Sequence, residues 1–174
     1  MHDSPPRPID AHAHLQCAID AARHAGLEAQ TGGCFGAVVI DNHSGRILGT
    51  GFNQVVSTND PTAHAEVQAI RNACTQNHTF HLRDTTLYTT SEPCPMCLAA
   101  AYWARISKVY YLCPATIAQD YGNFADCEFY NELTHPPHSR SLPVINISSH
   151  YPQEYTQMLD IWYRYSKLNS RVHY

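Results

Sequence analysis

The chain has 174 residues, of which 44% are hydrophobic, so it is long enough to bury a core without disulfide support. Its net charge of -4 and its pI near 6.3 argue against a nucleic-acid binder, since such proteins concentrate lysine and arginine on one face. No run approaches the roughly 20 apolar residues that a membrane helix needs, and the first residues lack the apolar core of a signal peptide. We therefore expect one cytoplasmic domain over residues 1–174, with neither a nucleic-acid nor a membrane partner.

The first two thirds of the chain alternate between segments with helical spacing of apolar residues and short β-rich segments, separated by turn residues. The predicted elements are, in order, a helix at 10–28, strands at 35–40 and 46–53, a helix at 62–77, a strand at 85–90, a helix at 95–104 and a strand at 108–113. After the first helix, this is a β-β-α-β-α-β order.

The last third predicts a helix-like stretch at 115–121, a strand at 144–148 and an aromatic-rich helix at 154–168. Nearly thirty residues separate the strand at 108–113 from the one at 144–148. A connection of that length suits a crossover to a parallel neighbour, whereas a tight hairpin would suffice for an antiparallel one. We therefore expect a five-stranded mixed sheet whose last two strands are parallel.

Three residues in two short motifs are candidate metal ligands. Cys94 and Cys97 lie three residues apart at a predicted helix start, so both sulfurs lie on one face, and the helix N-terminus favours the thiolate that zinc requires. His64 adds a third ligand, and a zinc site with three protein ligands keeps its fourth position for water, as catalytic sites do. We predict one Zn²⁺ per chain; the alternatives are a zinc knuckle and two buried cysteines.

Glu66 is the candidate catalytic base, because His-x-Glu with Pro-Cys-x-x-Cys is typical of zinc deaminases of nucleobases. In a regular helix His64 and Glu66 would point to nearly opposite sides, so we place both at the helix mouth. Two thiolates and an imidazole offset the charge of zinc, which makes a dedicated base necessary. Glu66 would take a proton from water, deliver it to a ring nitrogen and protonate the departing amine. The alternative is an ordinary glutamate in a first helical turn.

These motifs, with Tyr102–Arg105 after them, resemble the bacterial guanine deaminases of the cytidine deaminase superfamily, closely from about Gly32 to Tyr130. The resemblance implies a three-layer α/β/α fold of the cytidine deaminase type. It also implies zinc-dependent hydrolysis of guanine to xanthine and ammonia, and a homodimer. In that dimer, residues 150–174 would form a lid or an arm exchanged between chains.

Further site residues follow from the resemblance, position by position. Asn53 matches an Asn that the family places against the purine, and Phe35 matches an aromatic that stacks on the ring, although Cys34 stands where relatives often have Pro. Asp126 matches an acidic residue that contacts the base and is a candidate to shuttle a second proton, although the Gly-Phe-Asp-Asp of relatives is altered around it. The remaining substrate-binding positions are Ala65, the pocket-wall residue Trp103 and the terminal Tyr174. The alternatives are a strand-ending Asn, core aromatics and a frayed terminus.

Other functions stay open at this point. Deaminases of guanosine, cytosine or aminated triazines share the zinc motif, because the shape of the pocket decides the substrate. A tRNA adenosine deaminase should carry a more basic surface. A catalytically silent partner subunit, which uses zinc for folding alone, would have no need of Glu66.

Two further signals carry no functional prediction. His12 and His14 resemble the first-strand motif of the amidohydrolase barrels, but an eight-fold barrel needs about 200 residues or more in βα units. The five cysteines outside the zinc motif show no disulfide-like framework, so we expect them to be reduced. They are Cys17, Cys34, Cys74, Cys113 and Cys127.

Overall fold

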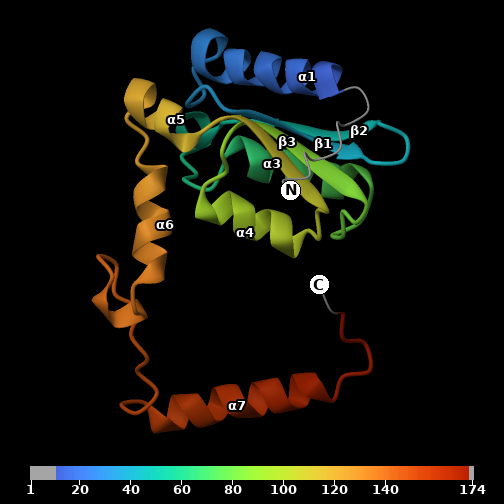
Figure 1. Ribbon diagram of the computed structural model, residues 1–174. Coiled ribbons are helices and arrows are strands. Elements are labelled where there is room, and N and C mark those ends of the chain that lie inside the picture. The colour runs from blue at the N-terminus through green and yellow to red at the C-terminus, as the bar shows by residue number, and fades with distance from the viewer. Residues whose placement is uncertain (1–10, 173–174) are drawn as a thin grey trace, which may run out of the picture. The chain divides into compact units, whose positions relative to one another are not determined.

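The computed structural model describes residues 11–172, apart from the side chains of residues 126 and 127. By its internal contacts the chain divides into two compact units, which we name the first region, up to Phe129, and the second region, from Tyr130 onward. The helices and strands (Figure 1) are α1 (Ala11–Arg23), β1 (Gly36–Asp41), β2 (Ile47–Phe52), α2 (Val55–Thr58), α3 (Ala65–Gln76), β3 (Thr85–Ser91), α4 (Pro95–Trp103), β4 (Lys108–Cys113), α5 (Ala115–Gly122), α6 (Asp126–Thr134) and α7 (Pro152–Ser166).

Four strands of the first region form one mixed sheet in the order β2-β1-β3-β4. β1 pairs antiparallel with both β2 and β3, whereas β3 and β4 are parallel. The parallel pairing follows from the connection, because α4 carries the chain back across the sheet between these two strands. The expected α/β fold with a mixed sheet is confirmed.

The predicted fifth strand at 144–148 is wrong, because this segment forms no strand. The amide of Val144 donates a hydrogen bond to the carbonyl of Pro137, within the same part of the chain. Val144, Ile145 and Ile147 are each more than half exposed. Their β-branched side chains favour an extended backbone. A strand must also pair with a neighbouring strand, and the residue composition of a segment does not predict such a pairing.

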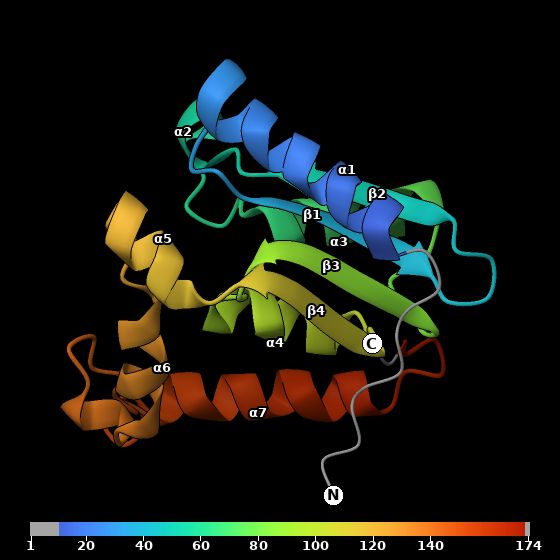
Figure 2. The same ribbon diagram turned by 45° about the horizontal axis from the view of Figure 1, so that its top comes forward.

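The sheet of the first region is covered on both faces. Along β1, Ala37 and Val39 pack in a cluster with residues of α3 and α4, while Val38 and Ile40 pack against α1. Figure 1 and Figure 2 both show α1 on one face and α3 and α4 on the other. All seven residues of β3 are buried, as expected for a strand with covered faces.

A close contact between β2 and α3 fixes the start of α3. Gly51 of β2 faces the first turns of that helix, and a Cβ there would overlap the carbonyl oxygen of Ala65 and the amide nitrogen of Ala69. The missing side chain lets the two backbones approach. The N-terminal end of α3 is thereby held against the sheet, which fixes the positions of His64 and Glu66 at the start of this helix.

The second region consists of most of α6, a 3-10 turn at Pro137–Ser139, an extended segment and α7. None of residues 130–172 is buried. α7 agrees with the predicted helix at 154–168, whereas α6 was not predicted. The single domain over residues 1–174 stays a prediction. Among the described helices, none is both long and apolar enough to cross a bilayer.

Candidate metal and substrate site

The N-terminus of α3 presents His64 and Glu66 together. His64 is the N-cap and has extended backbone, with φ -69° and ψ 153°, while Glu66 lies in the first turn. The sequence predicted both residues at the helix mouth, because two residues apart in a regular helix they would point to nearly opposite sides. The extended backbone of the N-cap changes the direction of the imidazole, so both side chains reach the same site.

The N-terminus of α4 presents the two cysteines. Cys94 is the N-cap, with φ -69° and ψ 167°, and Pro95 follows as the first helical residue, where its missing N–H is not needed. Cys97 lies in the first turn and is fully buried. The Pro-Cys-Pro sequence therefore starts α4 directly after Cys94, so that the sulfurs of Cys94 and Cys97 lie on the same side of the helix.

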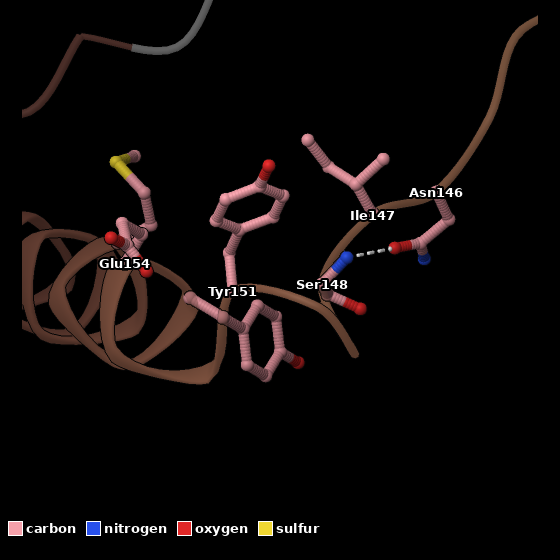
Figure 3. Close-up of a pocket in the computed structure, with 7 residues that line it drawn as sticks. Asn146, Ile147, Ser148, Tyr151 and Glu154 are labelled. Atoms are coloured by element: carbon pink, nitrogen blue, oxygen red, sulfur yellow. Dashed lines mark hydrogen bonds between the residues drawn. The ribbon is translucent and has the colours of Figure 1, made fainter.

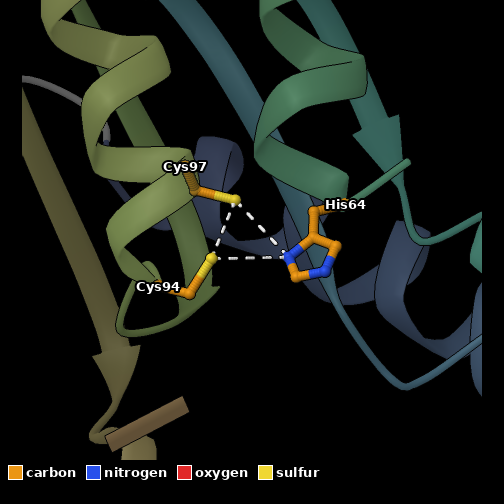
Figure 4. A group of neighbouring side chains, drawn as sticks. All are labelled: His64, Cys94 and Cys97. Carbon is orange, nitrogen blue, oxygen red and sulfur yellow. Dashed lines mark hydrogen bonds between the residues drawn. The ribbon is translucent and has the colours of Figure 1, made fainter. Parts of the chain in front are cut away.

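His64, Cys94 and Cys97 come together as a group that could hold a metal ion (Figure 4). The imidazole Nδ1 lies 3.7 Å from the sulfur of Cys94 and 3.5 Å from that of Cys97, and the two sulfurs are 3.6 Å apart. A tetrahedral zinc ion with ordinary bond lengths needs about 3.6 Å between nitrogen and sulfur and about 3.8 Å between sulfurs. The three side chains therefore fit zinc as they stand.

The charges of the two cysteines agree with a cation site. The hydrogen bond between the two sulfurs lowers the pKa of Cys94 to about 4, and the same contact raises the pKa of Cys97. The opposite shifts mean that, without a cation, one of the two sulfurs loses its proton much more readily than the other. A divalent cation between them would release the remaining proton, because metal binding and thiol deprotonation are coupled.

The carboxylate of Glu66 lies beside the cysteines in a buried position. Its Oε2 is 3.5 Å from the sulfur of Cys97, and its Oε1 accepts a hydrogen bond of 3.4 Å from the hydroxyl of Thr89 on β3. Burial raises the pKa of Glu66, mainly through desolvation. A carboxylate with a raised pKa is suited to take up a proton and to release it again.

A cavity of about 180 Å³, which we name the base cavity, brings the predicted substrate residues to this group. Phe35, Asn53, His64, Glu66 and Cys94 all line it. Asn53 is 4% exposed, and its Oδ1 accepts a hydrogen bond of 3.1 Å from the amide of Val55 at the start of α2. That contact fixes which end of the side-chain amide is the acceptor.

Four predicted residues are not placed in the base cavity. Ala65 is fully buried in the core between α3 and the sheet, and Trp103 ends α4 with 60% of its surface exposed; neither lines the cavity. Asp126 is the first residue of α6, but its side chain lies outside the described part of the chain, as does Tyr174. The roles of these four residues stay predictions.

Among the lining residues that the sequence did not predict, two make contacts that shape the site. Glu92 lines the base cavity, and its Oε2 accepts a hydrogen bond of 3.2 Å from the amide of Ala115, which ties the loop before α4 to the start of α5. Its position directly before Pro-Cys-x-x-Cys was the available signal. Phe124 comes from the segment after α5 and packs edge-to-face on Phe35, with ring centroids 5.0 Å apart. Nothing local in the sequence indicates that contact.

The other candidates in the described chain lack comparable chemistry. His12 is exposed, and His14 donates through Nε2 to the carbonyl of Gly45 at 2.8 Å on the opposite face of the sheet, so neither joins a metal-binding group. The second region has a hollow of about 450 Å³ (Figure 3). It is lined by Asn146, Ile147, Ser148, Tyr151, Glu154, Tyr155 and Met158, with Glu154 as its one ionisable carboxylate.

Comparison with known proteins gives a consistent result. Residues 8–113 match the model of the cytidine and deoxycytidylate deaminase zinc-binding region. The chain is 46% identical over 123 residues to a guanine deaminase of Bacillus subtilis strain 168, covering 71% of this chain and 77% of that protein. The X-ray structure of guanine deaminase from Bacillus subtilis superposes with a TM-score of 0.83 at 37% identity, over 95% of this chain and 99% of that one.

A second kind of relative is more distant. A tRNA-specific adenosine deaminase of Buchnera aphidicola is 38% identical over 111 residues, which covers 64% of this chain and 62% of that protein. This likeness spans less of both chains than the likeness to the guanine deaminase does.

Proposed function

Since the chain belongs to the family of cytidine and deoxycytidylate deaminases with a zinc-binding region, we propose that it hydrolyses guanine to xanthine and ammonia. Membership in this family makes it a zinc-dependent aminohydrolase. One observation carries the proposal: Phe35, Asn53 and Glu66 line one small cavity with two of the three metal-binding residues.

His64, Cys94 and Cys97 would hold the zinc, which supplies Lewis-acid activation of a water molecule when bound. Glu66 moves the protons. It accepts one from the attacking water and passes it to a ring nitrogen next to the carbon under attack. It then takes the second proton from the hydroxyl group now on that carbon and delivers it to the amino group, so that the carbonyl forms as the C–N bond breaks and ammonia leaves. Thr89, which bonds to Oε1, holds the carboxylate in place for these transfers.

The substrate is held by stacking and hydrogen bonding. Phe35 lies half-buried at the cavity and offers a ring face to a purine. Because the Oδ1 of Asn53 is engaged by Val55, the amide nitrogen is the end available to donate to an acceptor on the base. Asp126 would contact the base and shuttle a second proton.

Ala65, Trp103 and Tyr174 would complete the substrate site in a homodimer. The support for a dimer is the second region, whose large apolar side chains on α7 are exposed, among them Met158, Ile161 and Trp162. We propose that residues 150–174 form a lid or an exchanged arm, and that Tyr174 closes the site. Loss of residues 171–174 would then raise KM or lower kcat for guanine without loss of zinc. None of the six described cysteines is in a disulfide, which supports the proposed cytoplasmic location.

An ammonia-release assay tests the proposed function. Zinc-loaded protein would be offered guanine, guanosine, cytosine, an aminated triazine and a tRNA anticodon stem, with product identity checked by absorbance. We expect guanine to be turned over fastest and to yield xanthine. Preference for any of the other four substrates would move the assignment to that class, and no turnover of any would favour a silent partner subunit.

A further inference from the structure

A second cavity, of about 430 Å³, lies directly beside the base cavity, and we name it the rear cavity. Four residues line both: Gly32, Gly33, Phe35 and Phe124. Residues common to two cavities form the boundary between them. The two aromatic rings, which meet edge-to-face at 76°, are the only two side chains in this boundary, because the other two residues are glycines.

The sizes of the two cavities differ in a way that bears on the substrate. Pockets for drug-sized ligands measure about 300–1,000 Å³. The base cavity, at about 180 Å³, is smaller than that range and suits a bare heterocycle, whereas the rear cavity alone falls inside it. A nucleoside would therefore need space on both sides of the boundary.

The ring of Phe124 occupies a prepared position. Asn123 has a φ of 57°, which turns the chain sharply at the end of α5 and directs the next residue back over the loop that carries Phe35. A Cβ on Gly33 would lie 2.8 Å from Cζ of Phe124, and one on Gly122 would lie 2.6 Å from its Cδ2. Side chains at either glycine would displace the ring, so the local backbone is built around it.

We propose that the Phe35–Phe124 pair is a wall that determines specificity: it limits the base cavity to a purine base and excludes the ribose of a nucleoside. This inference rests on the proposed deamination of guanine and adds a residue, Phe124, whose ring sets the substrate size. Phe35 has a second role as the stacking face, so Phe124 is the side chain through which the wall can be tested alone.

The experiment compares kcat/KM for guanosine and guanine in the wild type, in Phe124→Ala and in Phe124→Leu. Removing the ring joins the two cavities, so we expect the guanosine-to-guanine ratio to rise at least about tenfold in Phe124→Ala. The rate with guanine itself should fall only about 2- to 10-fold, through loss of the edge-to-face contact. Phe124→Leu, which keeps part of the wall, should give an intermediate ratio.

Tyr121→Ala is the matched control, because Tyr121 lines the rear cavity but not the base cavity and is 88% exposed. Its ratio should equal that of the wild type. Partial misfolding lowers the rates with guanosine and with guanine together, so it does not change their ratio. The zinc content of each variant is measured as a further control. If the wild type turns over guanine but Phe124→Ala has the same guanosine-to-guanine ratio as the wild type, the Phe35–Phe124 pair does not determine specificity. The proposed function would still stand in that case. A wild-type protein without guanine turnover would overturn both.

Discussion

The two regions of the chain differ most in what they bury. Every residue of the described core lies in the first region, where both faces of the sheet are covered, and the second region buries none. The metal-binding group lies in the first region, on the N-termini of two packed helices. Rigid elements hold a metal site to the geometry it needs, whereas exposed apolar side chains remain available to another surface. In the proposed homodimer, the first region would carry the chemistry, and the second would bury its apolar side chains by association with the other chain.

Replacing Cys97 by Ala should have the largest effect of these changes. That effect should be confined to the first region. Because zinc binding is coupled to folding, we expect zinc to be lost, activity to disappear and the free energy of unfolding to fall by several kcal/mol. Metal analysis and urea unfolding measure this. Cys17→Ala, a half-buried cysteine of α1 outside the group, is the control and should keep its zinc. A stable, zinc-loaded and active Cys97→Ala protein would contradict the ligand set.

Replacing Glu66 by Gln should separate catalysis from metal binding within the first region. The amide keeps the size of the side chain but cannot accept the proton, so we expect kcat to fall at least about 10²-fold with zinc content unchanged. Glu28→Gln, an exposed glutamate after α1, serves as the control. If Glu66→Gln were as active as the wild type, Glu66 would not be the base that transfers the protons.

Replacing Trp162 by Glu should affect the second region and spare the zinc. Trp162 is 63% exposed on α7. In the proposed homodimer, a charge in place of an interface tryptophan would weaken association strongly. We expect the dimer dissociation constant, measured by sedimentation equilibrium, to rise at least about 30-fold. Arg164→Ala is the control, because the exposed ion pair of Arg164 with Asp160 contributes little. If Trp162→Glu dimerises like the wild type, α7 is not the interface.

Replacing Thr89 by Val should have the smallest effect. The hydroxyl holds Oε1 of Glu66 through one long hydrogen bond, so its loss should lower kcat about 5- to 10-fold and leave KM unchanged. Thr89→Ser should restore the rate. Thr86→Val removes a hydroxyl of the same strand that bonds to Asn42 instead, and should have no effect on kcat. A shift in KM instead of kcat would indicate a structural role for Thr89.

The sequence predicted the first region well because its signals are local. The predicted helices at 62–77 and 95–104 begin within three residues of α3 and α4, and short apolar runs placed the four strands. The failures concern contacts between distant residues. Val144–Ser148 has strand composition but no paired neighbour, and Phe124 reaches Phe35 only through the left-handed turn at Asn123. Neither pairing can be derived from composition or periodicity.

The number and kind of zinc ligands test the central claim, an open metal site in the first region, most directly. X-ray absorption at the zinc edge of the loaded protein should give two sulfur ligands at about 2.3 Å and two lighter ligands, nitrogen and oxygen, at about 2.0–2.1 Å. On this account the sulfurs would be those of Cys94 and Cys97, the nitrogen would be that of His64, and the oxygen would come from solvent. Three or four sulfur ligands would mean a closed structural site and would contradict the account.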